Sequence, residues 1–221
     1  MSEKKYSGES DAYRQIREEL LDAEIALKSQ VGRVAELRRK LPLNPVEREY
    51  VFREGPADLE QDEPLRETRL AELFDEGRDD LIVVHFMFEQ SWEKGCPMCT
   101  MWAHGYDAIA DYIRQNASFV VVAKQEIGKL RAWARERGWR NLRLLSAHDN
   151  DFIRDFGMEG DRGQQPGISV FRRQSDGSVR HFYTVDASMR PGHWNGMDLL
   201  TPVWSLLDLL PDGRPDWMPG H

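Results

Sequence analysis

Short apolar runs separated by helical segments are the feature that most limits how this chain can fold. Residues 81–88 (LIVVHFMF) and 118–123 (SFVVVA) are nearly continuous runs of β-branched and aromatic side chains, a pattern typical of strands buried on both faces. A third strand is predicted at 142–146 (LRLLS), and helical spacing of apolar residues lies between the strands. Because strands that alternate with helices through short connections form βαβ units, the sequence predicts a parallel sheet.

The later part of the chain predicts an antiparallel addition to this sheet. Residues 167–173 (GISVFRR) and 179–185 (VRHFYTV) flank the turn sequence QSDG, which indicates a β-hairpin. We therefore expect a mixed α/β domain with parallel strands first, a hairpin last and helices on both faces. The other predicted elements are a short strand within 45–56, a short helix at 68–74, a helix at 125–138 that ends at Gly138, and a closing helix at 198–210.

The N-terminal part of the chain predicts one long amphipathic helix over residues 11–41. Apolar residues recur there at spacings of three, four or seven, Ser10 is a suitable N-cap, and Pro42 ends the pattern. Such a helix is about 45 Å long, so its apolar stripe must pack on the following domain or on a second copy of the chain. We expect a helical extension at 1–45, a possible homodimer through this helix, and the α/β domain at 46–221.

Composition and charge exclude several classes of function. The net charge of -8 argues against binding nucleic acid, which requires clustered Lys and Arg. The polar start MSEKKYSGES has no apolar segment typical of a signal peptide, and no apolar run approaches the roughly 18 residues of a membrane span. We therefore expect a cytoplasmic protein without a membrane partner. A structural disulfide is unusual in that compartment, which favours metal or redox chemistry for a cysteine pair.

The chain has two cysteines, Cys96 and Cys99, in the segment SWEKGCPMCTMW. Cys96 falls where the first buried strand gives way to a helix, and the free N–H groups and dipole of a helix start favour a thiolate. The pKa of a cysteine there can fall from about 8.5 to roughly 3.5–7.5. Cys99 lies one turn further on, and Pro97 suits the first position of a helix. We expect Cys96 to be the nucleophile and Cys99 the resolving thiol.

A metal site is the main alternative use of these cysteines. A structural zinc site needs four ligands, and the sequence has no second cysteine pair. His104 lies five residues beyond Cys99, about 140° away around a helix. The sequence also lacks a GxGxxG, GxSxG or phosphate-loop motif. We therefore expect no bound metal and no cofactor, and electrons that arrive from another thiol or a small reductant.

A strand followed by CxxC at a helix start, further βα units and a closing hairpin resembles the thioredoxin fold. Members of that fold carry a cis-proline just before the hairpin and beside the redox cysteines, and Pro166 in QQPGISVF stands in that place. They often place an aromatic residue where Trp92 stands, shielding the disulfide. Thioredoxins have Gly-Pro between the cysteines, whereas Pro-Met resembles the Pro-first pairs of glutaredoxin-like and oxidase-like members, which leaves the redox direction open.

More closely, the chain resembles the bacterial DUF899 family of thioredoxin-like proteins, which are predicted dithiol-disulfide oxidoreductases. The resemblance covers most of the chain from about residue 35 and implies a fold and a chemical class, without a substrate. The matching segments are RRKLPLNPVEREYVF, LAELFDEGRDDLIVVHFMF, SWEKGCPMCTMWAHGYD, FGMEG, PGISVFRR and LLDLLP.

These observations predict a thiol-disulfide oxidoreductase that acts on a protein or small-molecule disulfide. An external reductant is expected to return its cysteines to the reduced form. Trp92, Pro97 and Pro166 are the expected substrate-binding residues. One alternative is a peroxidase of the peroxiredoxin type, although Glu93 stands where such enzymes usually have threonine. Another is a binding or redox-sensing protein on a thioredoxin-like scaffold.

Overall fold

The computed structural model describes residues 7–161, 163–189, 196–212 and 214–220. The chain divides into two compact units, Met1–Pro42 and Leu43–His221. This division lies three residues before the predicted one at 45/46. Asn44 and Pro45 belong to the second unit because they form strand β1, which pairs with strand β10 of the domain's sheet.

The first unit consists of the predicted long helix, α1, over Asp11–Arg38. Ser10 is its N-cap, as expected: the side-chain oxygen accepts a hydrogen bond from the N–H of Tyr13 at 3.1 Å. The helix ends at Arg38, ahead of the predicted end at residue 41. Within the described part of this unit, α1 is the single helix, so the unit itself supplies nothing to cover the apolar stripe.

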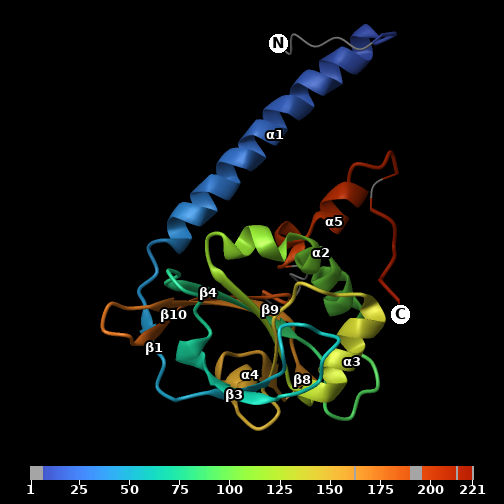
Figure 1. Ribbon diagram of the computed structural model, residues 1–221. Coiled ribbons are helices and arrows are strands. Elements are labelled where there is room, and N and C mark those ends of the chain that lie inside the picture. The colour runs from blue at the N-terminus through green and yellow to red at the C-terminus, as the bar shows by residue number, and fades with distance from the viewer. Residues whose placement is uncertain (1–6, 162, 190–195, 213, 221) are drawn as a thin grey trace. The chain divides into compact units, whose positions relative to one another are not determined.

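The second unit is built on an eight-stranded mixed sheet with the strand order β1-β10-β9-β4-β5-β6-β2-β3 (Figure 1). The β4/β5 and β5/β6 pairs are parallel, and the remaining pairs are antiparallel. The strands are β1 (Asn44–Pro45), β2 (Val51–Glu54), β3 (Arg66–Arg69), β4 (Asp80–Phe86), β5 (Ser118–Ala123), β6 (Leu144–Ser146), β9 (Gly167–Arg173) and β10 (Val179–Asp186), with β7 (Glu159–Gly160) and β8 (Gly163–Gln164) forming a separate ribbon.

The central four strands confirm the thioredoxin-like fold. Strand β4 leads into helix α2 (Pro97–Arg114) and then into its parallel neighbour β5, while the hairpin β9–β10 joins the other side of β4 in the antiparallel sense. Helix α3 (Ile127–Arg137) connects β5 to β6 and ends at Gly138, whose left-handed φ of 74° suits glycine. The predicted strands at 118–123 and 167–173 are found with the same bounds.

The side chains of β4 alternate between two hydrophobic clusters. Val84 and Phe86 pack with residues of α2 and α3, whereas Leu81 and Val83 pack on the opposite face. That second face is covered by the short helix α4 (Phe152–Asp155) and by a single 3₁₀ turn, η1 (Leu70–Glu72). Figure 1 shows α2 and α4 on opposite sides of the sheet, so helices cover both faces, as predicted.

The helix predicted at 68–74 is wrong. Residues Arg66–Arg69 form strand β3 instead, and only Leu70–Glu72 is helical, as the η1 turn. Thr68 pairs with Phe52 across the sheet, and its hydroxyl donates a hydrogen bond to the Glu54 carboxylate at 2.8 Å. These cross-strand contacts override the local helical spacing.

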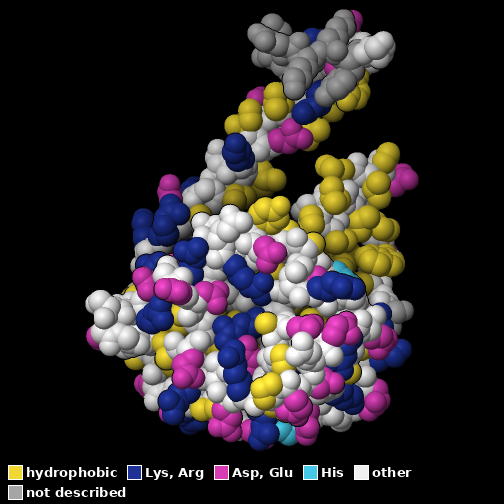
Figure 2. Space-filling view, viewed as in Figure 1, with side chains coloured by type: hydrophobic (Ala, Val, Ile, Leu, Met, Phe, Trp, Pro, Cys, Tyr) yellow, Lys and Arg dark blue, Asp and Glu magenta, His cyan; other side chains and the backbone are white. Residues whose placement is uncertain are grey.

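The closing helix is shorter than the predicted 198–210. Helix α5 covers Pro202–Leu207, after a separate 3₁₀ turn, η2 (Asp198–Leu200), because Thr201 is extended and Pro202 occupies the first helical position. Trp204 is the buried residue of α5. Figure 2 shows hydrophobic side chains gathered over α5 and the segment after it, while acidic and basic side chains intermix on the rest of this face of the domain.

Candidate active site

Cys96 lies at the N-cap of α2, beyond the carboxyl end of β4. Its N–H donates a hydrogen bond to the carbonyl of Met87 at 3.0 Å, which ties the end of the loop back to the residue that follows β4. Its carbonyl accepts the N–H and the hydroxyl of Thr100, both at 2.9 Å, in the first turn of the helix. Pro97 occupies the first helical position, as predicted. The backbone therefore places Cys96 at the positive end of an 18-residue helix.

The two cysteines have opposite environments and opposite pKa shifts. Cys96 is half-buried, whereas Cys99 is 3% exposed, and both are free thiols. A hydrogen bond from the Cys99 thiol lowers the pKa of Cys96 to about 6, with help from the N–H groups of Cys99 and Met98 and against the effect of burial. Burial raises the pKa of Cys99, and the neighbouring Cys96 raises it further. At neutral pH the accessible sulfur is a thiolate and the buried one a thiol.

A buried amide, Gln125, holds the loop that leads to Cys96. Its Nε2 donates to the carbonyl of Glu89 at 2.7 Å and to the carbonyls of Gln90 and Trp92 at 3.3 Å. The backbone carbonyl of Gln125 accepts a hydrogen bond from the Ser146 hydroxyl at 2.7 Å. Sequence reasoning missed this positioning residue. The available signal was a polar side chain two residues after a buried strand, at the end of the sheet where β4 also ends.

Gly95 is the point of closest approach between this loop and the core. A Cβ atom there would lie 2.6 Å from Cε1 of Phe86 and 2.9 Å from Nε1 of Trp133. Both side chains are buried aromatic residues that cannot move aside easily. Glycine therefore allows Cys96 to follow directly on a loop pressed against the core.

The Gly95→Ala substitution is expected to destabilise the protein by about 1–3 kcal/mol, because the added methyl overpacks a closed aromatic contact. The measurement is urea unfolding of the full chain. The control is Gly105→Ala within α2, where an added Cβ meets nothing within 4 Å and where alanine should stabilise by roughly 0.5–1 kcal/mol. Equal stabilities for the two variants would show that the contact at Gly95 has no energetic weight.

Pro166 lies at the same end of the sheet as the cysteines. In the β4/β9 ladder His85 is opposite Gly167, which places Pro166 opposite Phe86, just before the loop to Cys96. The neighbouring Gln164 is buried and its side-chain oxygen accepts the N–H of Phe88 at 3.1 Å. The segment that contains Pro166 therefore lies along the continuation of β4.

Members of the thioredoxin fold carry a cis-proline at this place, and the sequence alone left the form of the bond before Pro166 open. The Gln165–Pro166 bond is trans, and in the described part of the chain the cis bond found is Glu63–Pro64. Proline itself favours the trans form by about 0.5–1 kcal/mol. The carbonyl of Pro166 accepts the N–H of Ala187, which joins this segment to the end of the hairpin.

Trp92 lies in the loop between β4 and α2, with its side chain partly accessible at 36% exposure. Its N–H donates to the carbonyl of Glu89 at 3.0 Å, and Gln125 holds its carbonyl. The following residue, Glu93, forms an ion pair with Lys129 of α3 at 2.9 Å. These contacts hold the backbone of the loop around Trp92, whose side chain is partly exposed.

The second face of the sheet contains a buried polar chain. Nε2 of His85 lies 2.8 Å from the Ser169 hydroxyl, which lies 2.7 Å from the hydroxyl of Thr184, and Thr184 also contacts His181 at 2.8 Å. His85 is 2% exposed and stacks on Phe152. Burial, with a smaller effect of His181, lowers the pKa of His85 to about 3. His85 is therefore a neutral core residue on the face opposite the cysteines.

The part of the chain that the structure describes contains no group of three or more His, Cys, Asp or Glu side chains that could hold a metal ion. Over the same residues, every helix is too short or too polar to cross a membrane.

Similar solved structures include a reduced 2-Cys peroxiredoxin of Plasmodium vivax, with 11% identity, a TM-score of 0.45, and coverage of 63% of this chain and 81% of that chain. A structure described as a peroxiredoxin has 13% identity, a TM-score of 0.49, and coverage of 66% and 84%. Thioredoxin peroxidase I of Plasmodium yoelii has 12% identity, a TM-score of 0.48, and coverage of 81% and 100%.

No curated protein matches the chain. The sequence pattern of a bacterial family described as a protein of unknown function, DUF899, matches residues 2–219. The match extends over both structural units, from the N-terminal helix to the segment after α5. The chain therefore belongs to the DUF899 family.

Proposed function

We propose that this protein is a thiol-disulfide oxidoreductase in which Cys96 is the nucleophile and Cys99 the resolving thiol. The observation that carries the proposal is the contrast between the two sulfurs. A half-buried cysteine with a pKa of about 6 lies one helical turn from a fully buried cysteine with a raised pKa. Thiol-disulfide exchange needs this combination, because a thiolate attacks the substrate first and a protonated second thiol reacts only after the mixed disulfide has formed.

The reaction has two exchange steps. The Cys96 thiolate attacks one sulfur of a substrate disulfide, forms a mixed disulfide and expels the other substrate sulfur as a thiolate. Cys99 then loses its proton to the departing substrate sulfur and attacks Cys96, so that a Cys96–Cys99 disulfide forms and the second substrate thiol leaves. The substrate gains two electrons and the protein loses two. An external thiol or dithiol reductant returns the pair to its reduced form by the same exchanges in reverse.

The surrounding residues serve this chemistry in distinct ways. The partly exposed Trp92 lies in the loop that leads to Cys96, and Pro166 lies in the segment beside the continuation of β4. We assign substrate contact to these two residues and to Pro97, which starts the helix that carries both cysteines. Gln125 is a positioning residue, since it reaches the loop backbone and not the sulfurs.

The Cys99→Ser variant is expected to accumulate mixed disulfides with substrate through Cys96, because the second exchange step cannot occur. The measurement is non-reducing electrophoresis and mass spectrometry of the variant isolated after rapid acid quenching of cells. The matched control is Cys96→Ser, which retains one thiol but should trap nothing, since the Cys99 sulfur is buried. Equal trapping by the two variants, or trapping by Cys96→Ser alone, would contradict the assigned order.

A further inference from the structure

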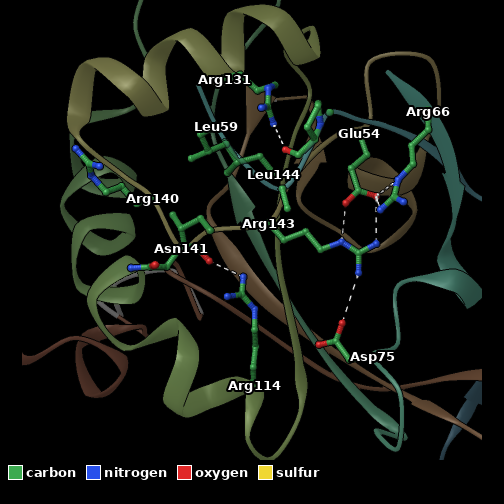
Figure 3. A pocket seen from close by; sticks show the side chains of 14 residues that line it. Glu54, Leu59, Arg66, Asp75, Arg114, Arg131, Arg140, Asn141, Arg143 and Leu144 are labelled. Atoms are coloured by element: carbon green, nitrogen blue, oxygen red, sulfur yellow. Dashed lines mark hydrogen bonds and ion pairs between the residues drawn. The ribbon is translucent and has the colours of Figure 1, made fainter. Parts of the chain in front are cut away.

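A pocket of about 470 Å³ opens between the loop after β2, the end of α2 and the start of β6 (Figure 3). Its wall is strongly basic in a protein whose net charge is -8. Two carboxylates, Glu54 and Asp75, line it, against five guanidinium groups, which leaves a formal surplus of three positive charges. The arginines are Arg66, Arg114, Arg131, Arg140 and Arg143.

Several of these arginines are fixed by the protein. Arg143 donates to the buried carboxylate of Glu54 through Nε at 2.7 Å and Nη2 at 3.1 Å, and Arg66 pairs with the same carboxylate at 3.1 Å. Arg114 pairs with Asp111 at 3.3 Å and donates to the carbonyl of Asn141. Each guanidinium has five N–H donors, so these contacts orient the side chains and leave donors for a ligand.

Arg131 is a buried cation without a carboxylate in hydrogen-bond contact. It is 2% exposed, and it donates to the neutral carbonyls of Pro56 at 2.9 Å and Asp58 at 2.8 Å. Its Nε is buried without a hydrogen-bond partner. The nearest carboxylate, Asp62, is 3.9 Å away and 60% exposed. A buried charge that lacks a close counterion favours an anion nearby.

Arg140 is the other lining arginine whose charge the protein does not match. Among the described residues, its side chain has no hydrogen-bond or ion-pair partner, and Figure 3 draws no interaction to it. Its backbone N–H, in contrast, is held by the Asp107 carboxylate at 2.9 Å. The backbone is thus anchored. The guanidinium, which Figure 3 shows on the side away from Glu54 and Arg143, has no contact within the described part of the chain that would prevent it from turning towards a ligand.

We propose that this pocket binds a small phosphate ester. The planar guanidinium fork matches phosphate oxygens in pairs, and a dianion offsets more of the positive surplus than a carboxylate does. The volume falls within the range of about 300–1,000 Å³ for small-molecule sites. Leu59, Leu142 and Leu144 form an apolar part of the wall, which suits the organic part of an ester better than inorganic phosphate alone.

The site is separate from the cysteines. Helix α2 starts at Pro97, next to Cys96, and reaches the pocket at its last residue, Arg114. Its 18 residues place Arg114 about 27 Å from the start of the helix at 1.5 Å per residue, and neither cysteine lines the pocket. A phosphate ester contains no disulfide, so this inference does not depend on the proposed thiol chemistry.

The test is calorimetric titration and thermal unfolding of the full chain with phenyl phosphate, inorganic phosphate and benzoate, each compared with sodium chloride at equal ionic strength. Phenyl phosphate is expected to bind most tightly and to raise the Tm by about 2–4 °C at saturation. Arg140→Gln should weaken its binding about tenfold, since one charge-assisted contact is lost. Arg114→Gln should do the same.

The control variant is Arg180→Gln on β10, which makes the same charge change outside the pocket and should leave the affinity unchanged. Arg140→Gln keeps the test valid if Arg114→Gln fails to fold, because the Arg140 side chain holds no structural contact. The proposal is overturned if no phosphate compound binds more tightly than chloride, if benzoate binds as tightly as phenyl phosphate, or if Arg180→Gln weakens binding as much as Arg140→Gln.

Discussion

In the Cys99→Ala variant, the midpoint of Cys96 alkylation is expected to move from about pH 6 towards the ordinary cysteine value of about 8.5. The largest contribution to the low pKa of Cys96 is the hydrogen bond from the Cys99 thiol, and alanine at position 99 removes that donor. The N–H groups of Met98 and residue 99 remain, so part of the lowering should persist. The measurement is the rate of iodoacetamide modification at Cys96 as a function of pH, followed by mass spectrometry.

The rate itself should differ most below neutral pH. At pH 5.5 the variant has far less thiolate, and its alkylation should be slower by roughly tenfold, even though a thiolate of higher pKa is intrinsically more nucleophilic. The control is Cys99→Ser, because a hydroxyl can donate the same hydrogen bond, and its midpoint should lie between the other two. An unchanged midpoint in Cys99→Ala would show that the helix start alone sets the Cys96 pKa.

The second large effect is a loss of stability in mild acid that originates at His85. Its pKa of about 3 in the folded protein lies below the value of about 6.5 in an unfolded chain. Below pH 6.5 the unfolded chain therefore binds a proton that the folded protein does not. The free energy of unfolding should fall by about 1.4 kcal/mol per pH unit between pH 6.5 and 3, and the full stabilisation is present above pH 6.5.

Urea unfolding of wild type and His85→Gln between pH 7 and pH 5 measures this effect. The free energy of unfolding of the variant should depend on pH less steeply than that of wild type, by the contribution of about one proton, because glutamine does not titrate. His181, whose pKa is also lowered by burial, contributes to the slope of both proteins, so the difference between them is the quantity to compare. Ser169→Ala is the control: it removes the hydrogen-bond partner of His85 but should keep the wild-type slope, since burial is the main cause. Identical slopes for wild type and His85→Gln would contradict the prediction.

The parts of the fold that could be predicted from the sequence are those fixed by local pattern. The strand at 118–123 is a nearly continuous apolar and β-branched run, typical of a strand buried on both faces. The strand at 167–173 is indicated by the turn sequence QSDG that follows it. The segment at 68–74 has helical spacing as well, yet pairing with β2 turns it into a strand. Such pairing depends on which strand lies alongside, and a single segment does not contain that information.

The same limit applies to the site. The proposed order of Cys96 and Cys99 rests on their place at a helix start, a local feature. Gln125 acts on a carbonyl 36 residues earlier, and the constraint at Gly95 comes from an aromatic pair that only the folded core brings together. The pocket arginines are likewise spread from residue 66 to residue 143, and the fold brings them around one pocket from β3, α2, α3 and the segment before β6.

The two ends of the strand order have a consequence for self-association. The sheet finishes with β1, which is two residues long and contains Pro45, and with β3, whose sequence is Arg-Glu-Thr-Arg. Open edge strands can template aggregation through their unpaired backbone groups, and short, charged or proline-containing edges hinder it. Both borders of the eight-stranded sheet are thus protected against strand addition, which keeps the apolar central strands out of reach of other chains.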